Sequence, residues 1–307
     1  MAAAATKKRQ ECLGSQIPPA ALVLLVEAAK FLMAITLWHV DKRAQSNDHV
    51  PDPEALSASK APDAPALHRN LAMFAPLALF YCIGNVLLLM ALDNIAAPVY
   101  ELLSTLRIPF SAAMAWAFAQ SGALLRLPQY TALVMLMAAN VLAHWHLEES
   151  SAPAAVYVVL VLLSQASSQT ANLLFELIAK ERFRTVSIHL QNAQLYFFGV
   201  LFNAVAYILM QHHKGSLSLS WLPCAGPWHL FLVLGLACNG IITGIVVKHQ
   251  GNVASVVAQS FAVHLAALLS HLLTRFTPSA HFMLAALLAQ AAILLYNKDH
   301  LSRKPSG

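Results

Sequence analysis

Long apolar segments dominate this chain of 307 residues, and they restrict its fold more than any other feature. Each is about 20 residues long, the length that an α-helix needs to cross the hydrocarbon core of a bilayer. Backbone groups have no water to bond in lipid, and the alternating pattern of a membrane barrel is absent, so we expect helices. The nine segments are about 17–40, 71–92, 99–118, 127–145, 154–178, 188–210, 228–247, 253–274 and 280–296.

Composition excludes a soluble enzyme. Hydrophobic residues make up 58% of the chain and charged residues 11%, against about 25% charged in soluble domains. The chain has no phosphate-binding Walker loop, no serine-hydrolase elbow and no zinc-protease histidine pair. We therefore expect no catalytic residues, no cofactor and no bound metal. The small net charge of +5 comes from basic residues in loops and tails, which does not favour nucleic-acid binding.

The distribution of lysine and arginine predicts how the chain is oriented. If the nine segments alternate across the bilayer, twelve of the nineteen Lys and Arg residues lie on the side of the C-terminus and five on the other side. Cytosolic loops are the more basic ones, so the C-terminal side is predicted to be cytosolic. We expect a single transmembrane domain over 1–307, with an N-terminal tail at 1–16, a flexible cytosolic loop at 41–70 and a cytosolic tail at 297–307.

Ionisable residues inside two apolar segments are the first functional candidates, because a charge in lipid is costly. Glu27 and Lys30 are three residues apart on one helix face and can pair. They either line a polar cavity or form a structural ion pair that locks helix packing. Tyr100, Ser104 and Arg107 share a second face, and arginine presents a fork of donors that matches phosphate oxygens.

Two further residues lie in the same stretch as that second group. Glu101 either lines the cavity or neutralises Arg107 structurally. Pro109 is expected to kink or end the helix locally.

A third polar group lies in the segment HLQNAQLYFFG. It contains Gln191, Asn192, Gln194 and Tyr196. Asn192 and Tyr196 are four residues apart and face one way on a helix. Amides and phenols of this kind hydrogen-bond a nucleobase or a sugar, but Asn and Gln also link membrane helices to one another. The sequence alone does not choose between these two interpretations.

These motifs occur in an order that resembles a known family. The stretches are VEAAKFL, the run from Tyr81 to AAPVYELLSTLRIP, FELIAKERFRTVSIHLQNAQLYFFGVLFN and NGIITGIVVKHQGNVASV. Between about residues 20 and 296 the chain resembles the nucleotide-sugar transporters of the drug/metabolite transporter superfamily. It looks closest to the branch that holds the CMP-sialic acid and UDP-galactose transporters, and within it to the "probable UDP-sugar transporter" members.

The resemblance implies ten helices in two inverted five-helix repeats, of which the nine visible apolar segments would lack the first helix. It implies a multi-pass Golgi membrane protein that exchanges a UDP- or CMP-linked sugar for the nucleoside monophosphate by alternating access. Lys30 and Arg107 would attract phosphate, and Glu27 would accompany Lys30 in the cavity. The remaining substrate-binding positions implied are Asn85, Tyr100, Glu101, Ser104, Asn192, Tyr196 and Ser255.

Several cationic positions of the family are neutral here, and they prompt an alternative. The family has basic residues where this chain has Ala123, Leu127 and Ser255, and each loss removes about 1–3 kcal/mol from an anion site. The alternative is therefore a transport-inactive relative that scaffolds or regulates other Golgi transporters, as a homo- or hetero-oligomer. Glu27 and Glu101 also prompt a third hypothesis, a carrier for an uncharged or cationic metabolite. The sugar and the base are not specified by the sequence.

Overall fold

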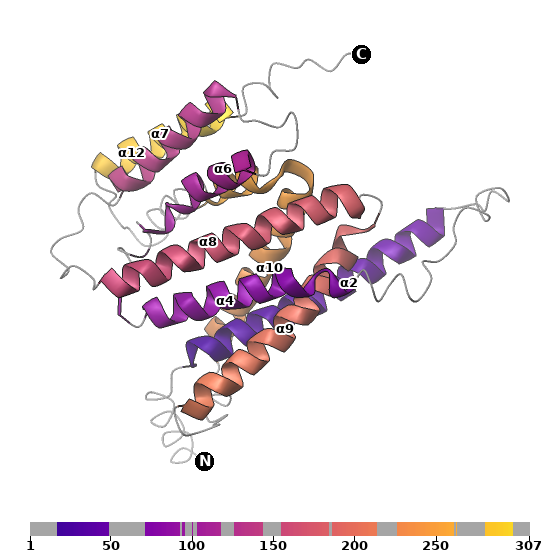
Figure 1. Ribbon diagram of the computed structural model, residues 1–307. Coiled ribbons are helices and arrows are strands. Elements are labelled where there is room, and N and C mark those ends of the chain that lie inside the picture. The colour runs from indigo at the N-terminus through magenta and orange to yellow at the C-terminus, as the bar shows by residue number, and fades with distance from the viewer. Residues whose placement is uncertain are drawn as a thin grey trace. The chain divides into compact units, whose positions relative to one another are not determined.

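The computed structural model describes residues 17–48, 71–92, 94–95, 100, 103–117, 126–143, 155–183, 186–213, 226–260, 262 and 280–296. These residues form helices and turns, with no β-strand among them (Figure 1). The helices are α2 (Pro19–Asp48), α4 (Ala75–Leu92), α6 (Arg107–Ala117), α7 (Leu127–Ala143), α8 (Ala155–Leu177), the π-helix η2 (Ile178–Arg182), α9 (Ile188–His213), α10 (Pro227–Gln250) and α12 (Ala280–Tyr296). A further unlabelled helical segment covers 252–260.

Five of the described helical stretches are long and apolar enough to cross a membrane. They are Pro19–Ala44, Ala75–Leu92, Ala155–Lys180, Ile188–His212 and Pro227–Gln250. Two shorter apolar helices cover Leu127–Leu142 and Met283–Tyr296. The prediction of a helical polytopic membrane protein is confirmed at this level. The number of nine or ten spans and the inverted repeat remain predictions.

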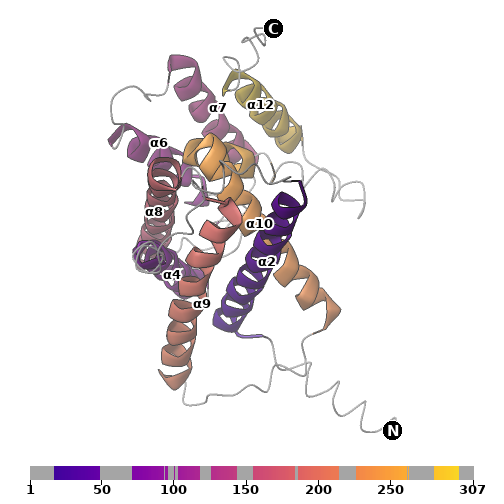
Figure 2. The ribbon, with the colours of Figure 1, turned by 90° about the vertical axis from the view of Figure 1, so that its right-hand side faces the viewer.

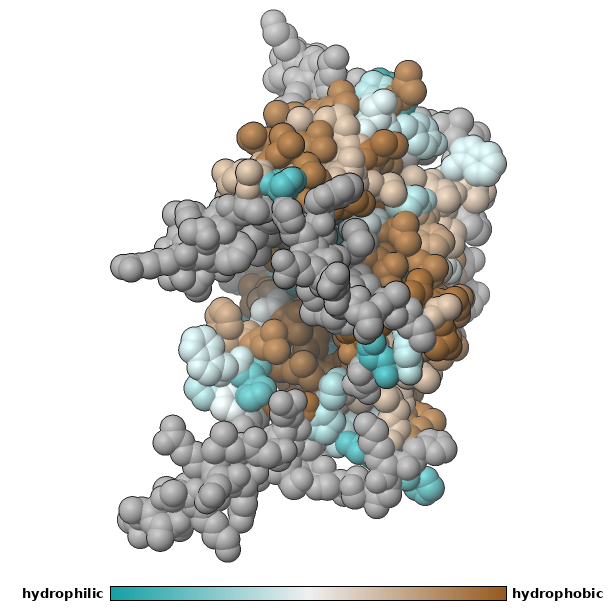
Figure 3. Space-filling model, turned by 90° about the vertical axis from the view of Figure 1, so that its left-hand side faces the viewer, coloured by the Kyte–Doolittle hydropathy of each residue, from teal (hydrophilic) through white to brown (hydrophobic). Residues whose placement is uncertain are grey.

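Large apolar side chains lie on the surface of these helices. Trp228 is 81% exposed, Phe231 is 73% exposed and Leu127 is 77% exposed. Figure 3 shows hydrophobic side chains gathered over one face of the molecule. Side chains of this size have no favourable contact with water, and they are typical of helices whose outer surface is covered by lipid.

The chain divides into two compact units. The first contains 1–86 and 177–245, and the second contains 87–176 and 246–307. The first unit holds α2, most of α4, η2, α9 and the larger part of α10. The second holds α6, α7, α12, nearly all of α8 and the segment at 252–260.

Helices α2 and α9 form the main packing pair of the first unit (Figure 2). Ala21 contacts Tyr207, and the rings of Phe31 and Phe197 are 6.2 Å apart. At the other end, Ser187 donates a hydrogen bond to Asp41. The partners' numbers fall as those of α2 rise, so the helices are antiparallel. The pairing runs over about 30 Å at 1.5 Å per residue, the thickness of a hydrocarbon core.

The second unit is built around a core of small and branched apolar residues. Helices α7 and α12 pack side by side (Figure 1). Ile108 of α6 packs in the same cluster, and so does Val256 of the segment 252–260. Leu136 and Ala289 are at most 1% exposed at its centre. Small residues such as Ala289 let membrane helices approach closely.

The loop expected at 41–70 is wrong for its first eight residues, because α2 continues to Asp48. Lys42, Arg43 and Ala44 are good helix formers and nothing in this stretch breaks a helix, so polarity alone does not end α2. The remainder, 49–70, lies outside the described residues.

The segment expected at 99–118 is interrupted close to Pro109. A turn at Thr105 and Leu106 precedes α6, and the N–H of Ile108 donates to the carbonyl of Thr105. A proline ring clashes with the carbonyl four residues earlier in a regular helix, which here is that of Thr105. The local break expected at Pro109 is therefore present. It lies between Ser104 and Arg107, so helical spacing does not by itself align their side chains.

Candidate functional site

An ion pair lies near the middle of the contact between α2 and α9. Lys30 Nζ donates to Glu27 Oε1 over 2.8 Å, and both side chains are largely buried, at 18% and 10% exposed. The pairing expected from their spacing is confirmed. Their separation of three positions places both residues on one face of α2, and this face packs toward α9.

Two tyrosine side chains lie close to this pair. Lys30 Nζ lies 5.5 Å from the centre of the Tyr196 ring, within the range of a cation–π contact. Tyr196, on α9, is 6% exposed. The carboxylate of Glu27 is also close enough to act electrostatically on the hydroxyl groups of Tyr196 and of Tyr81, on α4. Glu27, Lys30 and Tyr196 therefore form one buried polar group within the first unit.

Three glycines make the room in which polar side chains of this group lie. A Cβ atom at Gly199 of α9 would be 2.7 Å from Glu27 Oε2. One at Gly240 of α10 would be 2.5 Å from Lys30 Cε. One at Gly244, a helical turn further along α10, would be 2.6 Å from the Oδ1 atom of Asn192. These gaps would not hold an alanine without moving the polar side chain.

Asn192 is the most unusual residue of the group. It is fully buried, yet neither its Oδ1 nor its Nδ2 atom has a hydrogen-bond partner among the described residues. A buried polar group without a partner costs about 1–3 kcal/mol. Gly240 lies against Lys30, and Gly244 lies against Asn192. The two side chains are therefore about one turn of α10 apart, because four residues of a helix rise about 6 Å along its axis. The first unit thus holds a cation and an amide with unmet hydrogen-bonding capacity close together.

The neighbouring glutamine behaves differently. Gln191 Nε2 donates to the carbonyls of Phe183 and Val186, both over 2.9 Å. These bonds tie the start of α9 to the segment after η2, so Gln191 has a structural role. Asn85 lies on α4 and is partly exposed. Among the described residues of the first unit, no recorded interaction links Asn85 to Glu27, Lys30 or Asn192.

Arg107 and Ser255 meet in the second unit through a residue that the sequence analysis missed. Arg107 Nη1 donates to Gln259 Oε1 over 3.1 Å, and Gln259 Nε2 donates to Ser255 Oγ over 3.2 Å. Ser104 is also buried in this unit, at 5% exposed. The signal available in the sequence was a glutamine four residues after Ser255 inside an apolar segment.

The other two candidates of the second unit are less informative. Tyr100 packs with the apolar cluster that includes Ile95 and Val161, so its ring contributes to the core. Glu101 lies outside the described residues. Lys30 belongs to the first unit and Arg107 to the second, so their convergence on one cavity remains a prediction.

A second polar network surrounds the end of α10. Gly251 has a φ of 97°, the left-handed conformation that ends a helix, and the next helical segment begins at once. Glu176 Oε2 of α8 accepts the backbone N–H of Asn252 over 2.7 Å. Asn252 Nδ2 donates to Ser111 of α6 and to Gln169 of α8, each over 3.2 Å. The carboxylate thus caps a helix N-terminus, a favourable position for a negative charge.

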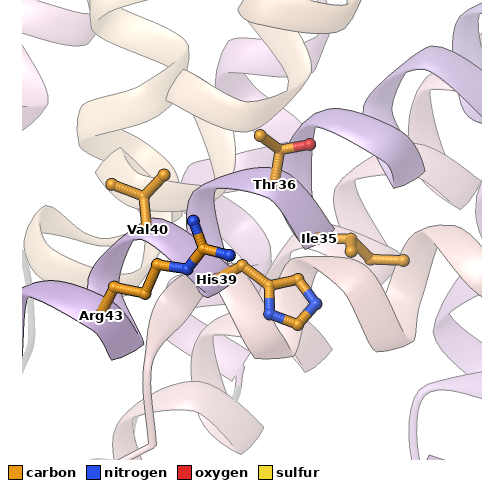
Figure 4. Close-up of a pocket in the computed structure, with 5 residues that line it drawn as sticks. All are labelled: Ile35, Thr36, His39, Val40 and Arg43. Atoms are coloured by element: carbon orange, nitrogen blue, oxygen red, sulfur yellow. The ribbon is translucent and has the colours of Figure 1, made fainter. Parts of the chain in front are cut away.

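A surface pocket on α2 is separate from the polar group. It is lined by Ile35, Thr36, His39, Val40 and Arg43 (Figure 4). These positions form a stripe on one side of α2, opposite the side that carries Glu27, Lys30 and Ala34. The pocket therefore cannot be formed by the side chains that face α9. We take the buried group around Lys30 and Asn192 as the candidate site.

Comparisons with known proteins give a consistent result. The family described as "Nucleotide-sugar transporter" matches residues 14–297. The "UDP-N-acetylglucosamine transporter" of Rattus norvegicus is 29% identical over 244 residues, covering 74% of this chain and 70% of that protein. The "Probable UDP-sugar transporter protein SLC35A4" of Homo sapiens is 28% identical over 253 residues, covering 76% and 75%.

A solved structure supports the fold alone. It bears the name "Crystal structure of protein" and matches with a TM-score of 0.62 at 15% identity, covering 97% of this chain and 93% of that one. The expectation from the four sequence motifs, that the chain resembles this family over most of its length, is confirmed.

Proposed function

Because the chain belongs to the nucleotide-sugar transporter family, we propose that it exchanges a UDP- or CMP-linked sugar for the nucleoside monophosphate across the Golgi membrane by alternating access. The observation that carries this proposal is the buried amide of Asn192, which has no partner among the described residues and lies one helical turn from Lys30. A bound ligand with a polar edge and a negative group nearby would satisfy both side chains. A nucleotide has both features.

Lys30 supplies the charge in this proposal. An ammonium group carries three N–H donors, and Glu27 Oε1 accepts one of them. A phosphate oxygen can take another without displacing Glu27. In the empty site, Glu27 prevents Lys30 from being an unpaired charge in a nonpolar environment, which would be costly. The ion pair is thus compatible with both the loaded and the empty carrier.

Asn192 and Tyr196 supply the recognition of the base. An amide presents one acceptor and two donor hydrogens in a plane, so it pairs with the edge of uracil or of cytosine. Tyr196, four residues later on the same face of α9, offers a ring on which a base stacks. The relatives named as carriers of UDP-sugars favour uracil. We therefore place a UDP-sugar first among the substrates.

Arg107, which donates to Gln259, is proposed as the second phosphate ligand, and Gln259 in turn donates to Ser255. Ser104, Tyr100, Glu101 and Asn85 are the other residues proposed to bind the substrate. The chain would then be oriented with its C-terminus in the cytosol, as its basic loops predict.

Counterflow in reconstituted vesicles tests the proposal. Vesicles containing the purified full chain are preloaded with UMP, CMP or AMP, and the uptake of radiolabelled UDP-N-acetylglucosamine, UDP-galactose or CMP-sialic acid is measured. We expect uptake of a UDP-sugar into UMP-loaded vesicles only. Uptake that ignores the preloaded nucleotide would contradict exchange, and no uptake of any of these sugars would support the transport-inactive alternative.

Two variants connect the activity to the site. Lys30→Gln should abolish exchange, because it removes the ammonium group that pairs with Glu27 and would bind the phosphate. Lys42→Gln serves as the control, since Lys42 is an exposed lysine on the same helix that contacts the ring of Trp38. Equal activity of the two variants would show that Lys30 is not part of the substrate site.

A further inference from the structure

The pocket on the outer side of α2 combines cationic and apolar side chains. Its five lining residues occupy positions 35, 36, 39, 40 and 43, and they border an open depression of about 320 Å³. Figure 4 shows Arg43 and His39 extending along the same side of the helix, with the guanidinium group next to the His39 side chain. Ile35 and Val40 supply apolar surface, and Val40 is 58% exposed.

The chemistry of this pocket matches a phosphate carried on an apolar molecule. Arginine donates two parallel hydrogen bonds to phosphate oxygens. Thr36 Oγ1 already donates to the carbonyl of Leu32 over 2.8 Å, so its oxygen is left to accept a bond from a hydroxyl group. Ile35 and Val40 offer no polar contact and suit a hydrocarbon chain. A small soluble anion would use Arg43 and His39 only.

The position of the pocket along α2 points to the membrane surface. The membrane-capable part of this helix ends at Ala44, so the pocket occupies its last turns, where lipid phosphates lie. Trp38 lies in the same turns, and tryptophan is enriched at membrane interfaces. The ammonium of Lys42 lies 5.7 Å from the centre of its ring. An interfacial tryptophan of this kind places this end of α2 at headgroup level.

The negative charge nearest to the pocket in the sequence is directed elsewhere. Asp41 lies about opposite to the pocket stripe on α2, two residues from His39. Asp41 Oδ2 accepts a hydrogen bond from Ser187 Oγ over 3.3 Å and lies 3.6 Å from His189 Nε2. Its carboxylate therefore faces α9, and the pocket side of the helix carries Arg43 without an acidic neighbour on α2.

We propose that this pocket binds the headgroup of an anionic phospholipid, with the phosphate against Arg43 and His39 and the lipid chain along Ile35 and Val40. A lipid is favoured over a free phosphate because the pocket is partly apolar and lies at the end of a membrane-capable helix. Basic pockets at this depth bind phosphoinositide and related headgroups in membrane proteins. The bound lipid would hold α2 at a fixed depth in the bilayer.

Thermal unfolding in lipid nanodiscs tests this site. The purified full chain is inserted into phosphatidylcholine discs with rising fractions of phosphatidylserine or phosphatidylinositol 4-phosphate, and its melting temperature is followed. We expect the anionic lipid to raise the melting temperature in a saturable way. Arg43→Gln should raise the half-saturating lipid fraction about tenfold, as expected for the loss of a charge-assisted hydrogen bond. Thr36→Val should weaken binding of the inositol lipid in particular.

Lys42→Gln is the matched control, because it removes the same charge one residue away but from a different side of α2. It should leave the half-saturating fraction unchanged. An equal loss in Lys42→Gln and Arg43→Gln would show diffuse attraction to a charged surface and overturn the pocket. A saturable increase with inorganic phosphate in phosphatidylcholine discs would show a free-anion site, and no increase with either lipid would show that the pocket binds no headgroup.

Discussion

The two glycines of α10 that lie against Lys30 and Asn192 lead to a sharp prediction. Replacing Gly240 or Gly244 by alanine places a methyl group 2.5 Å from Lys30 Cε or 2.6 Å from Asn192 Oδ1. Ordinary contacts of a Cβ atom begin at 3.4 Å. Each side chain must therefore move by about 0.8–0.9 Å, if the helices stay in place.

This displacement should affect transport far more than folding. The atoms that must move belong to flexible side chains, and alanine is about 1 kcal/mol better than glycine inside a helix, so the variants should fold. A charge-assisted hydrogen bond to a ligand is worth about 1.5–3 kcal/mol. Losing it at Lys30 corresponds to roughly 10- to 150-fold weaker nucleotide binding. The bond from Asn192 to a base is between neutral groups and is worth about 0.5–1.5 kcal/mol, so its loss corresponds to roughly 2- to 13-fold weaker binding.

Gly235 is the matched control on the same helix, since nothing lies within 4 Å of a Cβ atom placed there. The assay is exchange of UDP-sugar against UMP in vesicles, together with the melting temperature of each purified variant. We expect Gly235→Ala to transport normally, and Gly240→Ala and Gly244→Ala to lose most exchange while remaining folded. Normal exchange in the last two variants would refute the reasoning that these glycines seat the site's polar groups.

Three further predictions concern stability and can be measured as melting temperatures of purified variants. Asn192→Leu should leave stability unchanged or raise it, because no hydrogen bond to a described residue is lost. Asn203→Leu on the same helix should lower stability by about 1 kcal/mol, because it loses the bond to the Gly199 carbonyl. Equal destabilisation of the two variants would mean that Asn192 has a structural partner. Glu27→Gln should lower stability by about 3 kcal/mol, because it leaves the ammonium of Lys30 unpaired. The double variant Glu27→Gln with Lys30→Met should regain most of that stability. A double variant as unstable as the single one would contradict the pairing. Asn252→Ala should cost about 2 kcal/mol, since its amide donates to two buried acceptors, and an unchanged melting temperature would show that the network has no stabilising effect.

Local spacing in the sequence accounts for features of each unit. In the first unit, the pairing of Glu27 with Lys30 follows from their separation of three residues. In the second unit, α12 covers the residues of its apolar run. Asn192 and Tyr196 also lie four residues apart on α9, so helical spacing places them on the same side of that helix. These features depend on interactions within a single helix, which is why sequence alone predicts them.

Contacts between helices could not be predicted in the same way. Gln259, which joins Arg107 to Ser255, lies 152 residues from Arg107. The bond from the backbone of Asn252 to Glu176 spans 76 residues. The sequence shows that these residues are polar and lie in apolar surroundings, but their partners depend on which helices pack together. The end of α2 was also misplaced, because a helix can continue into water after its apolar part ends.

The central claim is that a pyrimidine nucleotide contacts α9 beside Lys30. Photolabelling with 4-thiouridine monophosphate tests it most directly, when the labelled residue of the reconstituted full chain is mapped by mass spectrometry. We expect labelling in the part of α9 that holds Asn192 and Tyr196, or in the facing turns of α10 at Gly240 and Gly244, and we expect excess UDP-sugar to prevent it. Labelling confined to other helices, or labelling that UDP-sugar does not reduce, would contradict the account.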